Sequence, residues 1–235
     1  MKLPTLLMPL LLLSTLPLES SELFKARVYR QGTDREELLF TLENDEIRGE
    51  EGILSIHRYL TPEGEIFAEE SLLFMGEGNY THSTSFYKIG EYSLLETRGD
   101  RMTISFRRGD RTREKSLERR EDLLFGPAQQ KFIRENYSAL REGTAVNFSL
   151  PVPELTSTAE FYLKRTEHSG YGKPGHLVME MGSSHFFINL ILDEIFYVID
   201  DNTLLIKEIH GPSLLRTYEG GKWKPADVDI LFFYE

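Results

Sequence analysis

Apolar and polar residues alternate with a period of two through much of this chain. At 24–28, Phe24, Ala26 and Val28 are separated by Lys25 and Arg27. This is the pattern of a strand that buries one face, because successive side chains point to opposite sides of a sheet. Segments with strand character follow at 38–42, 53–60, 65–75, 83–89, 92–98, 102–106, 146–150, 159–163, 176–181, 195–199, 203–210 and 228–234. Short strands at this spacing predict an antiparallel meander, not a βαβ fold.

One segment has the period of a helix instead. Pro127 suits the first helical position, and Gly143 suits a left-handed residue just past the end. At 100° per residue, 127–142 divides into two faces. The apolar face carries Ala128, Phe132, Ile133, Tyr137, Ala139 and Leu140, and the polar face carries Lys131, Arg134, Glu135, Ser138, Arg141 and Glu142. We therefore predict an amphipathic helix that must bury its apolar face.

A second, short helix is one interpretation of the segment after Ser183. Ser183 can cap a helix, and Phe186, Phe187, Leu190 and Ile191 follow at helical spacing. A buried strand fits the same residues equally well.

Together these elements predict an α+β fold. We expect a curved, mostly antiparallel, half-barrel-like sheet wrapped on one central amphipathic helix, with a second short helix possible. No linker, repeat or low-complexity segment interrupts the chain, so we expect residues 21–235 to form a single domain.

The first twenty residues do not belong to this pattern. Lys2 precedes an apolar run at 3–18, which is followed by Glu19 and Ser20. This order is typical of a secretory signal peptide, and the run is short for a membrane span. We expect residues 1–20 to be a signal peptide and the protein to be exported. Because the chain contains no cysteine, a Gram-negative periplasm is the expected destination. An uncleaved N-terminal membrane anchor is the alternative.

Charge restricts the partners. The 235-residue chain has a formal net charge of −11 and an isoelectric point near 5.1. Nucleic-acid binding requires a basic surface, so we expect no nucleic-acid partner. The basic stretch 101–120 includes Arg107, Arg108, Arg111, Arg113 and Lys115, but acids are interleaved. Cross-strand ion pairs are the expected role of these residues, and an anionic partner is the alternative.

Few residues indicate catalysis or metal binding. His168, His176 and His185 lie near Met179 and Met181, and this pairing could suit copper. Methionines in the core and histidines on the surface fit the pattern better, and His57, His82 and His210 are likewise expected on the sheet surface. There is no cysteine and no G-x-S-x-G motif. We predict no cofactor, no metal site and no catalytic residue.

An apolar cavity is the site that the pattern favours. The chain holds 15 Phe and 11 Tyr, and a sheet curved over one helix can enclose a cavity. The expected ligand-binding residues are Phe132, Asn136, Phe148, Phe161, Leu163, Phe187 and Leu190. Asn136 lies within the apolar face of the helix, where its amide needs a partner. Either it fixes the helix against the sheet, or it contacts a ligand.

The central region resembles a known but uncharacterised group of exported proteins from Gram-negative bacteria. The resemblance rests on 131–134, Tyr137, Leu140 and Gly143, then on 146–148, Pro153, 161–163 and the region around 193–195. The order of strands, helix and strands is also similar to periplasmic carriers of the lipoprotein-localisation type. That similarity implies a curved sheet around an apolar cavity and implies no catalytic residue.

Three functions follow as hypotheses. The first is a non-enzymatic periplasmic binding or carrier protein for an apolar or lipid-like ligand. The second is a structural or interaction module of the cell envelope, with an envelope protein as its partner. The third is a hydrolase of unknown substrate, because catalytic groups need not be adjacent in sequence.

Overall fold

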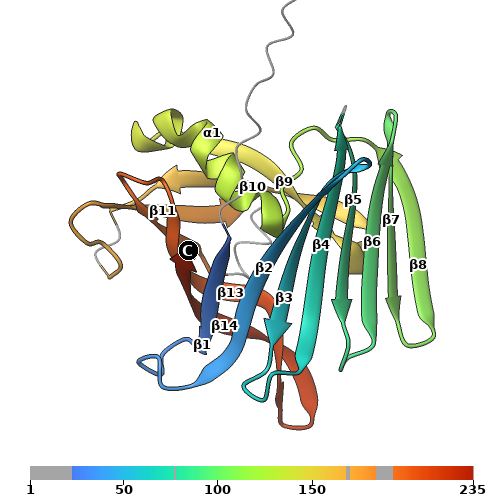
Figure 1. Cartoon of the computed structure of the whole chain (residues 1–235), viewed down its shortest axis with the longest axis horizontal. Helices are drawn as coiled ribbons and strands as arrows, with labels where there is room; N and C mark the ends of the chain where they lie inside the picture. Colours follow the sequence, from blue (N-terminus) through green and yellow to red (C-terminus); the bar gives the residue numbers. More distant parts are fainter. Residues whose placement is uncertain (1–22, 77, 168–169, 184–192, 235) are drawn as a thin grey trace, which may run out of the picture.

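A computed structural model describes residues 23–76, 78–167, 170–183 and 193–234, and within them fourteen strands form one sheet (Figure 1). The strands are β1 (Phe24–Arg30), β2 (Leu38–Gly49), β3 (Gly52–Leu60), β4 (Ile66–Gly76), β5 (Asn79–Phe86), β6 (Glu91–Arg98), β7 (Arg101–Arg108), β8 (Arg111–Glu118), β9 (Val146–Val152), β10 (Ser157–Arg165), β11 (His176–Ser183), β12 (Ile195–Asp200), β13 (Ile206–Glu219) and β14 (Lys222–Tyr234). The helical elements are η1 (Gly126–Ala128), α1 (Gln129–Arg141) and η2 (Pro153–Leu155).

The sheet is an antiparallel meander that starts and ends at its centre. Its order is β8-β7-β6-β5-β4-β3-β2-β1-β14-β13-β12-β11-β10-β9. The first strand pairs along its whole length with the C-terminal half of the last strand, from Phe24 with Tyr234 to Arg30 with Val228. The two halves of the chain therefore extend in opposite directions from this pair. The sheet is open, and the connection that carries α1 joins its two edge strands, β8 and β9.

The predicted helix is confirmed. Pro127 lies in the 3₁₀ turn that leads into α1, and Gly143 adopts a left-handed φ of 84° just after the helix. Two backbone hydrogen bonds close the last turn, from Gly143 N to Leu140 O (3.0 Å) and from Thr144 N to Ala139 O (2.9 Å). The predicted second helix falls on 184–192, outside the described residues, whereas Ser183 is the last residue of β11.

Among the residues that the structure describes, buried apolar side chains form three clusters. The first joins Ile133 and Leu140 of α1 to β9, β10, β11 and β12. The second, which includes Val28, Phe40 and Phe67, lies between β1, β2, β4, β13 and β14. The third lies under β5, β6 and β7 against Phe125. The prediction of a mostly antiparallel, curved sheet with one helix holds, but α1 contributes side chains to only the first cluster.

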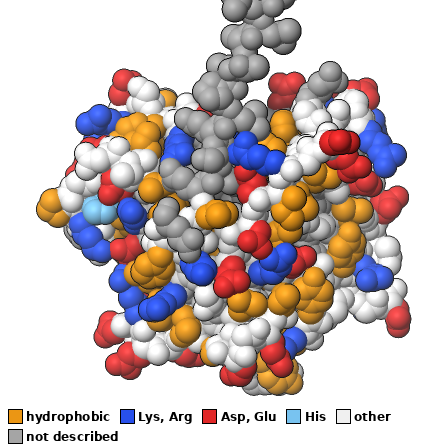
Figure 2. Space-filling view, viewed as in Figure 1, with side chains coloured by type: hydrophobic (Ala, Val, Ile, Leu, Met, Phe, Trp, Pro, Cys, Tyr) orange, Lys and Arg blue, Asp and Glu red, His pale blue; other side chains and the backbone are white. Residues whose placement is uncertain are grey.

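An ionic cluster links strands that are distant in the sheet. Glu91 on β6 is 5% exposed, and its carboxylate lies 2.7 Å from Arg108 on β7 and 3.4 Å from Arg216 on β13. Both arginines also contact Glu154 of η2, at 2.5 Å each. Within the basic stretch 101–120, Arg108 and Arg120 thus form ion pairs with acids outside it, and the Arg108–Glu91 pair is a cross-strand pair of the expected kind. Elsewhere, charged side chains of both signs are interspersed over the visible surface (Figure 2).

No helix in the described part of the chain is long and apolar enough to cross a membrane.

Candidate ligand-binding site

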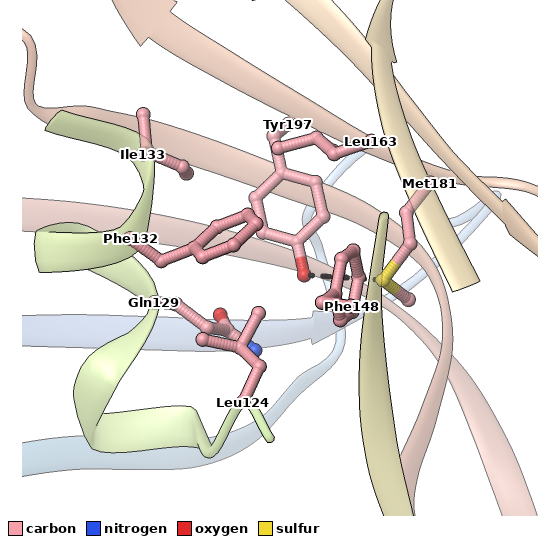
Figure 3. Close-up of a pocket in the computed structure, with 8 residues that line it drawn as sticks. All are labelled: Leu124, Gln129, Phe132, Ile133, Phe148, Leu163, Met181 and Tyr197. Carbon is pink, nitrogen blue, oxygen red and sulfur yellow. Dashed lines mark hydrogen bonds between the residues drawn. The ribbon is translucent and has the colours of Figure 1, made fainter. Parts of the chain in front are cut away.

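A small apolar hollow lies between α1 and the sheet (Figure 3). It is lined by Leu124, Gln129, Phe132, Ile133, Phe148, Leu163, Met181 and Tyr197. Leu124 comes from the connection before η1, three residues come from the first turns of α1, and the others come from β9, β10, β11 and β12.

The local periods of the sequence bring these side chains together. Gln129, Phe132 and Ile133 are spaced by three and four residues, so they share one helix face. On the sheet, Leu163 pairs directly with Met181 across β10 and β11, and their side chains therefore point to the same face. The Phe132 ring meets the Phe148 ring edge to face, with centroids 5.2 Å apart. The helix thus closes the hollow with an aromatic pair.

The hollow is small and almost free of polar groups. The centre of a water molecule can occupy about 10 Å³ of it, roughly the room for one water. Ligand pockets for drug-sized molecules have volumes of about 300–1,000 Å³. Its polar groups are the Gln129 amide and the Tyr197 hydroxyl. The site therefore offers apolar contact and neutral hydrogen bonds, and its lining supplies no nucleophile or charged acid–base group.

Polar contacts tether α1 along the side that faces the β12–β13 connection. The Gln130 amide donates to Leu204 O at 2.7 Å, and its oxygen accepts from Ile206 N at 2.9 Å. Two turns further on, the Tyr137 hydroxyl donates to the Asp201 carboxylate. These bonds fix the helix above the hollow without filling it.

Six of the seven ligand-binding residues expected from the sequence fall into three groups. Phe132, Phe148 and Leu163 line the hollow. Phe161 is buried beside it, its ring 6.2 Å from that of Phe148, and does not line it. Phe187 and Leu190 lie outside the described residues.

Asn136 is the remaining expected residue. Its amide donates to Phe132 O at 2.8 Å, one turn back in the same helix. This bond connects α1 neither to the sheet nor to the hollow, and Gln130 and Tyr137 make the contacts to the β12–β13 connection instead.

Three histidines expected on the surface are buried, so that expectation was wrong. His57 and His82 are each 6% exposed and flank Glu70 on the inner face. Glu70 accepts a hydrogen bond from Gly126 N at 3.2 Å, contacts His82 Nε2 at 2.8 Å and lies 3.9 Å from His57 Nδ1. Burial alone would raise the pKa of Glu70, but the hydrogen bond and charge of His82 bring it below its ordinary value. Burial lowers the pKa of His57.

His210, 1% exposed, forms a second buried cluster. Its Nδ1 lies 2.7 Å from Asp229, its Nε2 lies 3.2 Å from Glu208, and the Tyr171 ring stacks on it at 3.9 Å. The contact with His210 is the main reason that the pKa of Glu208 falls to about 2. Both ring nitrogens face carboxylates, and the cluster holds Tyr171 and Lys173 against β13.

The residues considered for copper do not converge. Met179 and Met181 are buried in the first cluster, whereas His176 Nδ1 lies 3.2 Å from Pro174 O. His168 and His185 lie outside the described residues. In the part of the chain that the structure describes, no group of three histidines and acids is arranged to hold a metal ion.

The chain has no match among protein-family models, curated proteins or solved structures.

Proposed function

We propose that this protein is an exported, non-enzymatic carrier that binds an apolar, lipid-like ligand between α1 and strands β9 to β12. The observation that carries the proposal is the apolar hollow beneath the helix, where three of the residues expected from the sequence meet. Apolar walls with few polar groups are the usual composition of a lipid site.

Binding would require α1 to move. The hollow has room for about one water, so an acyl chain enters only if the half-buried Phe132 ring swings away from Phe148. The tethers through Gln130 and Tyr137 lie toward one side, so the helix can pivot about them. In the loaded protein, the half-barrel-like sheet would wrap around helix and ligand together.

Export is part of the same proposal. The apolar run at 3–18 would direct the chain to the periplasm, where a water-insoluble ligand needs a protein to cross between membranes. An uncleaved run would instead keep the carrier attached to the membrane. The proposed carrier needs no cofactor, because neither the binding nor the release of its ligand changes a covalent bond.

Native mass spectrometry of protein purified from a periplasmic extract tests the proposal. We expect a bound mass that solvent extraction removes and that chromatography identifies as a lipid. The proposal fails if the protein is free of ligand and also binds neither 2-octanone nor n-octane, two apolar probes of a chain-shaped site.

The second candidate is an interaction module of the cell envelope. The near-filled hollow favours it, and so does β8, an edge strand with seven of its eight residues exposed. Exposed edges can pair with a partner strand. Cross-linking in intact cells from positions on β8 would identify a reproducible envelope partner if this function holds, and the purified protein would then carry no lipid.

A further inference from the structure

The Tyr197 hydroxyl is buried and poorly paired. Tyr197 is 4% exposed, and its hydroxyl lies 3.9 Å from the Met181 sulfur, a weak acceptor. Figure 3 shows this hydroxyl directed into the hollow, between Phe148 and the Gln129 side chain. The Tyr234 hydroxyl, by contrast, donates to a carbonyl oxygen, Ile206 O, at 2.7 Å. Buried hydroxyls are ordinarily satisfied, so a poorly paired one that faces a cavity points to a missing acceptor.

A second donor lies on the wall of the hollow that α1 forms, whereas Tyr197 lies on the wall that the strands form. The Gln129 side chain lines the hollow and carries an amide N–H donor. No charged side chain lines the hollow, so an ionised ligand group would be buried there without a counter-charge, which is unfavourable. Burial also raises the pKa of Tyr197, which keeps its hydroxyl protonated as a donor.

We propose that the hollow selects apolar molecules that carry one uncharged carbonyl oxygen, such as esters or ketones, and that Tyr197 is the residue that determines this specificity. The inference rests on the proposed function and names the class of its ligand. The Tyr197 O–H donates to the carbonyl oxygen, the Gln129 N–H supplies a second donor, and the hydrocarbon part lies against Phe132, Phe148 and Leu163.

Headspace gas chromatography over the whole purified protein measures the affinity for two volatile probes of similar shape, 2-octanone and n-octane. In Tyr197→Phe, we expect the affinity for 2-octanone to fall about tenfold, the size of one neutral hydrogen bond, while the affinity for n-octane stays within about twofold. Equal changes for both probes would overturn the inference and leave the proposed function intact. If the unaltered protein binds neither probe, the proposed function and the inference fail together.

Tyr137→Phe is the matched control, because its hydroxyl bonds Asp201 outside the hollow. It should lower the urea midpoint of unfolding and leave the ratio of the two affinities unchanged. Tyr197→Phe should leave the midpoint unchanged, since its hydroxyl gives up only a thioether contact. A fall in midpoint as large as that of Tyr137→Phe would show that the Tyr197 hydroxyl, or a water bound to it, is structural, and would contradict the inference.

Discussion

Phe132→Ala separates the stability of the fold from the capacity of the hollow. The ring is half-buried and packs edge to face on Phe148 at 5.2 Å. Truncation of a fully buried Phe to Ala costs about 3–5 kcal/mol. Because one side of this ring faces solvent, we expect about half of that, roughly 2 kcal/mol, including the aromatic contact.

The same truncation should improve ligand binding. Without the ring, the hollow joins the space that the ring occupied, still bounded by Leu124, Ile133 and Phe148. Burial of two further methylene groups contributes about 1.6 kcal/mol, so the affinity for n-octane should rise about tenfold. We therefore expect Phe132→Ala to lower the stability of the fold and to raise the affinity for n-octane together.

Urea unfolding and headspace partition measure the two effects on the same sample. Phe40→Ala is the control: Phe40 is 4% exposed in the second cluster, where its ring stacks on Phe67. It should cost about 3–5 kcal/mol and leave octane binding unchanged. If Phe132→Ala loses stability without binding octane more tightly, the hollow is a packing defect and the reasoning is refuted.

Three further predictions concern polar groups inside the protein. Acidification from pH 7 to pH 4 should lower the free energy of unfolding, because His57 and Glu70 have pKa values below their ordinary 6.5 and 4.5 and the unfolded chain therefore binds more protons at these two groups. Glu70→Gln should flatten the plot of unfolding free energy against pH below pH 4.5. Gly126→Ala should cost about 1–3 kcal/mol in urea unfolding, because its new Cβ would lie 2.4 Å from Glu70 Oε2 and displace the part-buried hydrogen bond from Gly126 N to Glu70. Asn136→Leu should change stability by less than about 1 kcal/mol and leave the partition of both probes unchanged, because the Asn136 amide bonds to Phe132 O within the helix.

The sequence predicted elements more readily than their arrangement. Alternation identified strands such as 24–28, and the two-faced pattern identified α1, because each has one buried side. Strand β8 carries no alternation, since only Leu117 among its eight residues is even partly buried, and it was not predicted. The pairing of β1 with β14 joins residues about 200 positions apart, and no local signal encodes it.

The candidate site was predicted in part for the same reason. Phe132, Phe148 and Leu163 lie on apolar faces that the periods reveal. Tyr197 lies on an equally buried face. Because tyrosine has both an apolar ring and a polar hydroxyl, its presence in a strand does not predict whether the side chain is buried. His57, His82 and His210 are each buried against a carboxylate on a neighbouring strand. The local sequence pattern does not show such partners, so it predicted these histidines on the surface.

Intermolecular NOEs between bound 2-octanone and the protein's methyl groups test the central claim most directly. We predict contacts with Ile133 of α1 and Leu163 of β10, on opposite walls of the hollow, and none with Val28 or Ile104 in the other two clusters. Contacts with Val28 or Ile104 instead, or binding that leaves Ile133 and Leu163 without an NOE, would contradict the account.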